Sequence, residues 1–428
     1  GEKIKVIKAM TDGEEGRRVA DSILEQKNRY HLSNTNIAIL YRTNSQSRVF
    51  EEYLRRYNIR YKVYGGQSFY QRKEVKDLIA YLRAATNPKD DEAYKRIINY
   101  PKRGIGKTTV DKITAFADEH DISFWEAMGQ IQLTKRTTTL LRGFQTLILG
   151  FNRKANSADA YEAALHISKG SGLHKTLKSD SSMEGIGRFE NFNALLDGVK
   201  EFVDNDEVTN DEVDNDKSLG TYLQNIALLT DQDDEGQEDD FVTLMSIHSA
   251  KGLEFKSVFI VGLEENLFPS YMSMHSADQL DEERRLFYVA ITRAERFLTL
   301  SYANCRYQFG QMRYNDPSRF LEEIPQTSLL SFGVSRSTKP DFSNPRIVGN
   351  FNKPRKKNLP DLVSEADFNP SPQSAIKEGV KVLHRKFGKG TVVNIDGHKN
   401  NLLATIEFEG IENPKRIALK YAKLQVMD

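Results

Sequence analysis

Cysteine is almost absent from the sequence, because Cys305 is its only thiol. One thiol cannot form an internal disulfide, and no zinc cluster is recognisable, so we expect a reducing compartment, the cytoplasm, and no metal site in this chain. A signal peptide and an apolar run of membrane-spanning length are also lacking, so we expect no membrane partner. The 61 basic and 60 acidic side chains nearly cancel. Any contact with nucleic acid must therefore come from local placement of charge.

The phosphate-binding P-loop is missing too. Residues 101–109 (PKRGIGKTT) contain Gly-Lys-Thr, but the position five before Gly106 is Pro101, where a P-loop needs glycine. The residues before this segment have the pattern of a helix and not that of a strand. An acidic motif of the DExx type is absent as well. Because the chain starts without Met and soon enters strand-like sequence, we expect it to be part of a longer protein.

Residues 101–109 suit a different ligand. Gly104 and Gly106 expose backbone amides, and Thr108 and Thr109 can cap the helix that begins there. A helix N-terminus with free amides and nearby cations binds a backbone phosphate of DNA well. The candidate contacts are Arg103, Gly104, Ile105, Gly106, Lys107 and Thr108. The alternative is a plain turn between two helices.

Two stretches have the alternating strand and helix pattern of a parallel α/β sheet. The first predicts strands at 37–41 (IAILY) and 59–64 and helices at 49–57 and 75–82. The second predicts strands at 242–247, 258–263 and 297–303 and a helix at 282–294. We therefore predict one α/β domain in two pieces, residues 1–87 and 240–330.

The rest of the chain divides into three segments. Residues 88–239 are helical in pattern and predict an inserted all-α domain, with acidic stretches at 204–216 and 231–240 as solvated loops. Residues 331–375 are rich in Ser, Pro, Asn and Lys, which predicts a flexible linker. Residues 376–428 alternate apolar and polar residues in short runs, which is typical of a small β-barrel.

The loop within residues 246–269 (SIHSAKGLEFKSVFIVGLEENLFP) carries His248, Lys251, Gly252 and Glu254. It leaves the carboxyl end of a strand, where ligands collect in open α/β sheets. Gly252 allows close approach of the backbone. His248 and Lys251 can meet phosphates, and Glu254 can accept a hydrogen bond from a ribose hydroxyl. A polar loop between two core strands is an equally favoured alternative.

Arg293 lies near the end of an amphipathic helix in residues 282–303 (EERRLFYVAITRAERFLTLSYA), just before a buried strand. A rigidly held guanidinium can bind a phosphate through two hydrogen bonds. The alternative is an exposed helix arginine.

These two strings resemble motifs V and VI of the UvrD/PcrA/Rep family of superfamily-1 DNA helicases. YRTNSQSRVFEEYL from Tyr41 resembles motif IV, and GGQSFYQRKEVKDLIAYLR from Gly65 resembles the motif that ends the first piece of the second motor domain. PSRFLEEIP from Pro317 is similar to the closing segment of that domain, and residues 101–109 resemble the GIG motif, which contacts duplex DNA. The resemblance implies an α/β RecA-like second motor domain with a helical insertion.

The resemblance implies a role for each matching residue at the nucleotide. Tyr41 stacks on the adenine, although from the sequence it could equally be a core residue. Arg42 and Arg293 reach the γ-phosphate, Arg293 as the arginine finger, and Gly252 and Glu254 lie on the nucleotide side of motif V. The P-loop and the Mg²⁺ ligands belong to the first motor domain, so this chain alone is expected not to hydrolyse ATP.

The resemblance also implies DNA and protein partners. His248 and Lys251 couple motif V to single-stranded DNA, and the whole protein moves 3′→5′ with ATP and Mg²⁺. Residues 376–428 are similar to the Tudor-like, SH3-like domain of PcrA-type proteins, which implies RNA polymerase as a partner. The bases there line either a binding rim or a solvated strand face: Lys381, His384, Arg385, Lys386 and Lys389.

Two other functions remain as alternatives. A non-catalytic adaptor that binds DNA and RNA polymerase would need no P-loop, but neither would it need both Arg42 and Arg293. A helicase–nuclease subunit is disfavoured, because the C-terminal segment has no cluster of carboxylates with a lysine.

Overall fold

The computed structural model describes residues 1–204, 216–230, 240–330, 371, 375–384, 388–396, 403–408, 415–418 and 424–426. Nearly all of the predicted linker, most of both acidic stretches, and Arg385 and Lys386 lie outside these residues. The chain divides into two compact units, Gly1–Ser335 and Arg336–Asp428. Each unit is described by itself.

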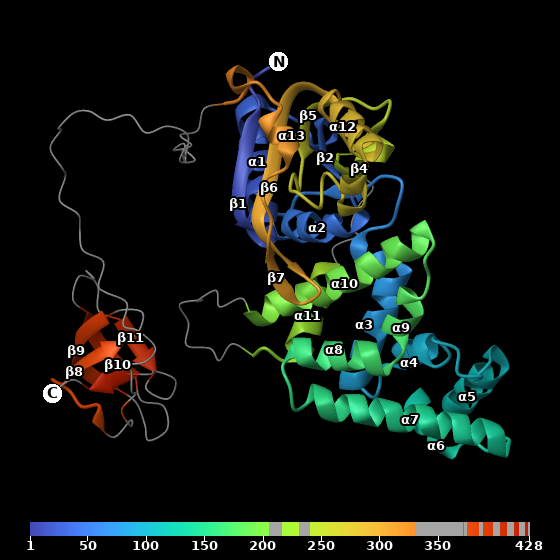
Figure 1. Ribbon diagram of the computed structural model, residues 1–428. Coiled ribbons are helices and arrows are strands. Elements are labelled where there is room, and N and C mark those ends of the chain that lie inside the picture. The colour runs from blue at the N-terminus through green and yellow to red at the C-terminus, as the bar shows by residue number, and fades with distance from the viewer. Residues whose placement is uncertain are drawn as a thin grey trace, which may run out of the picture. The chain divides into compact units, whose positions relative to one another are not determined.

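A mostly parallel sheet organises the first unit (Figure 1). Its strand order is β1-β6-β5-β2-β4-β3, with β7 beside β6, and only the β6–β7 pair is antiparallel. The strands are β1 (Lys5–Thr11), β2 (Ile37–Tyr41), β3 (Tyr61–Val63), β4 (Val242–Ser246), β5 (Phe255–Ile260), β6 (Ala294–Gln308) and β7 (Gln311–Tyr314). The two sequence pieces interleave in one sheet, because β2 lies between β4 and β5.

The central strand β2 is buried along its whole length, which explains its continuous apolar run. Tyr41 at its end is paired with Ser246 at the end of β4. The carboxyl ends of β2 and β4 therefore meet at one edge of the sheet, as the motif positions require.

The helices of the α/β part are α1 (Asp12–Tyr30), α2 (Ser47–Arg56), α12 (Ala277–Ile291) and the short α13 (Arg319–Glu322). Helix α1 was not predicted from the sequence. Its N-terminus is capped by Thr11, whose side chain accepts a hydrogen bond from the Glu14 amide. Gly13 and Gly16 interrupt its pattern, and both face close neighbours: a Cβ at Gly16 would lie 2.6 Å from Val49.

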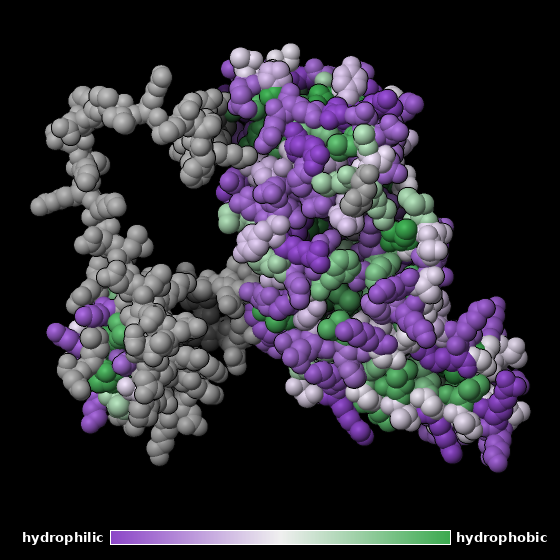
Figure 2. Space-filling view, viewed as in Figure 1, coloured by the Kyte–Doolittle hydropathy of each residue, from purple (hydrophilic) through white to green (hydrophobic). Residues whose placement is uncertain are grey.

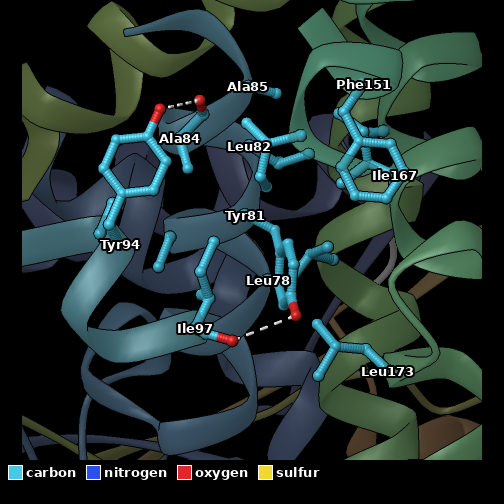
Figure 3. Packing of buried hydrophobic residues seen from close by; sticks show 14 of the residues in the cluster. Leu78, Tyr81, Leu82, Ala84, Ala85, Tyr94, Ile97, Phe151, Ile167 and Leu173 are labelled. Atoms are coloured by element: carbon cyan, nitrogen blue, oxygen red, sulfur yellow. Dashed lines mark hydrogen bonds between the residues drawn. The ribbon is translucent and has the colours of Figure 1, made fainter. Parts of the chain in front are cut away.

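Nine helices of the first unit lie between its two α/β pieces in the described sequence. They are α3 (Lys73–Thr86), α4 (Asp91–Ile97), α5 (Lys107–His120), α6 (Phe124–Gln130), α7 (Lys135–Ala155), α8 (Ala160–Gly170), α9 (Leu173–Lys178), α10 (Met183–Asp204) and α11 (Leu219–Thr230). One apolar cluster joins them, and it already begins at Phe69. Figure 3 shows Leu78, Tyr81 and Leu82 of α3 inside this cluster, with Tyr81 donating a hydrogen bond to the Ile97 carbonyl. The helical core thus reaches across the predicted boundary at residue 88.

Arg48 joins the α/β part to the helical part. Its guanidinium lies 3.2 Å from Glu52 on α2 and 3.1 Å from Glu201 on α10, and only 5% of its side chain is exposed. Burial raises the pKa of Glu201 to about 7, against the opposing effect of Arg48. A Cβ at Gly198 would lie 2.7 Å from Arg48 Nη1, so glycine is needed where α10 passes this arginine.

A second buried charge cluster lies within the α/β part. Arg306 on β6 pairs with Glu15 of α1 and with Glu264, whose Oε1 lies 2.6 Å from Nη2. Neither carboxylate side chain is exposed. The Gly262 amide and the Ser301 hydroxyl also donate to Glu15. Hydrophilic residues predominate on the face shown in Figure 2. The two carboxylates of this cluster, in contrast, are fully buried.

The second unit contains a five-stranded antiparallel sheet in the order β11-β10-β9-β8-β12. Its strands are β8 (Lys381–His384), β9 (Gly388–Asp396), β10 (Leu403–Phe408), β11 (Lys415–Ala418) and β12 (Leu424–Val426). Val382, Val392 and Ile406 are buried in its core. Within the described residues β11 and β12 form no pair, so a closed barrel stays a prediction.

Candidate nucleotide and DNA sites

Arg42 follows the last residue of β2 and is held by Glu283 of α12. The guanidinium Nη2 lies 2.6 Å from Glu283 Oε1, and Nε lies 3.1 Å from both carboxylate oxygens. The side chain of Glu283 is only 6% exposed, while 21% of Arg42 is exposed. Arg42 therefore has limited conformational freedom and lies at the carboxyl edge of the sheet, as expected from the sequence.

The positive charge of Arg42 influences the pKa values of two other residues, His248 and Glu190. Burial and the positive charge of Arg42 lower the pKa of His248, while Glu283 and Glu282 raise it. Burial raises the pKa of Glu190 on α10, and Arg42 opposes this effect. His248 therefore lies within electrostatic range of Arg42, as does Glu190, a carboxylate of the helical part that the sequence did not indicate.

The motif V loop leaves β4 through a short 3-10 turn, Ile247–Ala250, and crosses to the start of β5. Lys251, Gly252 and Glu254 are exposed on it. Gly252 has φ +88°, and no atom lies within 4 Å of the position of a Cβ there. The backbone at Gly252 is therefore open to a ligand.

Arg293 is tied to the same loop. Its Nη1 donates a hydrogen bond of 3.0 Å to the Leu253 carbonyl, and its Nε donates one of 3.0 Å to the Val289 carbonyl. The Phe255 amide in turn donates to the Arg293 carbonyl. Motifs V and VI thus form one connected segment.

The structure does not bring Arg42 and Arg293 to one point. Their partners on α12, Glu283 and Val289, are six residues apart, which is about 9 Å along a helix. Arg42 follows the carboxyl end of β2, whereas Arg293 precedes the amino end of β6, so the two residues approach the motif V loop from its two ends.

Tyr41 is fully buried in the core beneath the edge. Burial raises the pKa of its phenol, and the hydroxyl has no hydrogen-bond partner among the described residues. This geometry matches the core alternative of the sequence analysis. Adenine stacking on Tyr41 would require its ring to become exposed.

The turn before α5 is organised by side chains that face inward. Asn99 Oδ1 accepts hydrogen bonds from the amides of Arg103 and Ile105, at 2.9 and 3.2 Å. The Arg103 guanidinium donates to the carbonyls of Ile97, Pro101 and Ser171. The expectation that this guanidinium contacts DNA does not fit these bonds, and Ile105 is fully buried. Arg103 and Ile105 therefore stabilise the turn from its inner side.

The outer side of this turn has the features of an anion site. The N-cap of α5 is Gly106, without a side-chain cap, so the expectation that Thr108 or Thr109 caps the helix was wrong. Among the described residues, the amides of Lys107 and Thr108 have no acceptor, whereas those of Thr109 and Val110 donate to the Gly106 carbonyl. Gly104, with φ +80°, Gly106, Lys107 and Thr108 are exposed there.

Comparison with known proteins agrees with this arrangement. Residues 1–305 match the family model of the UvrD-like helicase C-terminal domain. The chain belongs to the UvrD-like helicase family. Residues 379–425 match the PcrA/UvrD tudor domain. The ATP-dependent DNA helicases PcrA of Staphylococcus aureus and Staphylococcus epidermidis are 36% and 37% identical to the chain.

Each of these two alignments covers 99% of the chain but only 57% and 56% of the relatives, so the chain spans little more than half of their length. In the described part of this UvrD-like chain, no helix is long and apolar enough to cross a membrane. The same residues contain no group of three His, Cys, Asp or Glu side chains placed to hold a metal ion.

One hairpin of this UvrD-like chain was not predicted from the sequence. β6 continues past the sheet and turns at Phe309 and Gly310 into β7, with Phe309 and Tyr314 58% and 79% exposed. The Gly310 amide donates a 2.7 Å hydrogen bond to Asp197 of α10, and burial raises the pKa of Asp197 to about 6. A glycine between short aromatic runs (RYQFGQMRY) was the available signal.

If the turn before α5 binds a phosphate of duplex DNA, a negative charge introduced there should weaken duplex binding. Gly106→Glu should weaken binding of a DNA duplex by roughly tenfold and lower the salt slope by about one, because it places a carboxylate at a phosphate site. The Cβ has open space, so the fold should be unaffected. Fluorescence anisotropy at several salt concentrations measures this effect. Gly150→Glu on α7, also in open space, is the matched control, and an equal loss there would contradict the assignment.

Proposed function

We propose that the chain is the second motor domain, with its inserted and C-terminal domains, of an ATP-dependent 3′→5′ DNA helicase or translocase. The observation that carries this proposal is that Glu283 of α12 holds Arg42, while Arg293, two residues past the end of α12, donates to the Leu253 carbonyl of the motif V loop. Arg42 lies beside the start of this loop, at the carboxyl ends of β2 and β4, and Arg293 lies beside its end, at the amino ends of β5 and β6. Arginines suit a phosphate that gains charge during transfer. The PcrA relatives support the same activity.

At the nucleotide, each of these residues has a distinct task. Arg42 and Arg293 balance the charge of the γ-phosphate, Arg293 as the arginine finger. The open backbone at Gly252 and the exposed carboxylate of Glu254 face the ribose and phosphates. ATP would bind with Mg²⁺, which offsets phosphate charge, through ligands on the first motor domain. Tyr41 would serve the adenine only after exposure of its ring.

Single-stranded DNA is proposed to cross His248 and Lys251, and the duplex to contact the turn before α5. These contacts address phosphates, so binding should depend little on base sequence. The exposed rings of Phe309 and Tyr314 on the β6–β7 hairpin offer stacking surfaces for unpaired bases.

RNA polymerase is the proposed partner of residues 376–428, and the cytoplasm the proposed location. The match to the PcrA/UvrD tudor domain supports the partner. In a pull-down, this segment should retain RNA polymerase. An Arg385→Glu/Lys386→Glu variant should lose this retention.

The motor and the adaptor differ in one measurable property. We predict that the chain alone does not hydrolyse ATP with DNA and Mg²⁺, because it lacks a P-loop, and that the complete protein does. A coupled phosphate-release assay on both proteins measures this. DNA-stimulated turnover by the chain alone would contradict the assignment of roles, and a complete protein without turnover would favour the adaptor.

A further inference from the structure

Glu283 has more partners than an ordinary helix carboxylate. Besides the three contacts with Arg42, its Oε2 accepts a hydrogen bond from the Ser270 amide and its Oε1 accepts one from the Ser273 hydroxyl, both at 3.3 Å. The residue is 5% exposed. This carboxylate is fixed by its own helix, by Arg42 after β2, and by Ser270 and Ser273 before α12. It therefore has little conformational freedom and can orient the group that it binds.

The contact with Glu283 uses only one side of the Arg42 guanidinium. Nε and Nη2 face the carboxylate, whereas no hydrogen bond within the described residues uses Nη1. A guanidinium has five N–H donors in a rigid plane, so the side that carries Nη1 stays available to a phosphate. The pairing with Glu283 therefore orients the guanidinium of Arg42 and leaves its Nη1 side free to donate hydrogen bonds.

We propose that Glu283 is a positioning residue, which aims the free edge of Arg42 at the γ-phosphate. This inference rests on the proposed function, in which Arg42 serves that phosphate. Because Glu283, which holds Arg42, and the Val289 carbonyl, which accepts from Arg293, both belong to α12, this helix contacts both arginines. A displacement of α12 then moves both groups together.

Other charged groups also act on Arg42. Glu190 of α10 is a second carboxylate within electrostatic reach of Arg42, and burial raises its pKa. His248 lies near the same guanidinium. Without Glu283, Glu190 of the helical part remains as a carboxylate that attracts Arg42. The guanidinium would then turn away from the α12 side of the edge.

The test is a double-mutant cycle in the complete helicase, with ATP turnover on single-stranded DNA as the readout. Glu283→Gln keeps one acceptor oxygen but loses the two-oxygen contact, so kcat should fall roughly tenfold with little change in KM for ATP. In an Arg42→Ala background the same substitution should cost less than about twofold, because its partner is already absent. Glu282→Gln, the same chemical change at an exposed position of α12, is the matched control.

Each outcome of this cycle has one meaning. Normal turnover in Arg42→Ala would refute the proposed role of Arg42. A large loss in Arg42→Ala with normal turnover in Glu283→Gln would overturn the inference alone, and so would additive losses in the double variant.

A measurement on the chain itself guards against misfolding. The Nε–H of Arg42, followed by NMR in ¹⁵N-arginine-labelled chain, should exchange slowly with water because Glu283 accepts from it. In Glu283→Gln the exchange should quicken at least severalfold at an unchanged melting temperature. Equal exchange in both proteins would overturn the inference.

Discussion

Replacing Arg293 by alanine in the complete helicase is expected to lower ATP turnover by roughly 10³–10⁵, the usual contribution of an arginine finger. The loss should appear in kcat more than in KM, because the guanidinium acts on charge that develops during transfer. Single-strand binding without nucleotide should persist, because the proposed contacts with single-stranded DNA are His248 and Lys251 of the motif V loop, and Arg293 is not one of them. Steady-state kinetics and a DNA titration separate the two effects.

The structure supplies the controls for this experiment. Arg293→Lys keeps the charge but not the planar fork, so much of the loss should remain. Arg296→Ala removes an arginine three residues away that is 58% exposed and pairs with Glu2, so turnover should change little. A fall of less than about tenfold in Arg293→Ala, or a similar fall in Arg296→Ala, would show that Arg293 is not the finger.

The sequence predicted the sheet better than it predicted the side chains at its edge. The apolar run of β2 and the alternation of strands and helices depend on local pattern, and the strands at 37–41 and 242–247 were confirmed within one residue. Arg42 and His248 accordingly lie at the expected edge. Their partners depend on packing: Glu283 is separated from Arg42 by 241 positions, a distance that no spacing rule spans.

The misses have similar causes. The glycines of α1 weaken its helical pattern, although they are needed for contact with neighbouring elements. The apolar face of α3 was predicted, but a periodic pattern does not say which neighbour it meets, and it packs with the helical part. Arg103 was expected at DNA, yet its guanidinium reaches the Ser171 carbonyl, 68 positions away.

Arg306→Met should destabilise the α/β part by about 3–5 kcal/mol at neutral pH, because it leaves Glu15 and Glu264 buried without their cation. Burial already raises the pKa of Glu15, and Arg306 opposes this effect, so the substitution should raise the pKa further. A carboxyl with a raised folded-state pKa favours the folded state at low pH and loses that stability as pH rises. The defect should therefore be smaller at pH 5 than at pH 8.

Cys305 offers a local measurement of this change, because it is the only cysteine, is 4% exposed and precedes Arg306 on β6. Thiol labelling, normalised at each pH to the rate in denaturant, reports the free energy of opening around β6. Labelling should accelerate strongly in Arg306→Met and little in Arg313→Met, an exposed arginine on β7. Adding Glu15→Gln and Glu264→Gln to Arg306→Met should restore much of the stability, because no uncompensated charge remains. An equal defect at both pH values, or no recovery in the triple variant, would show that packing by the Arg306 stem, and not its charge, stabilises this region.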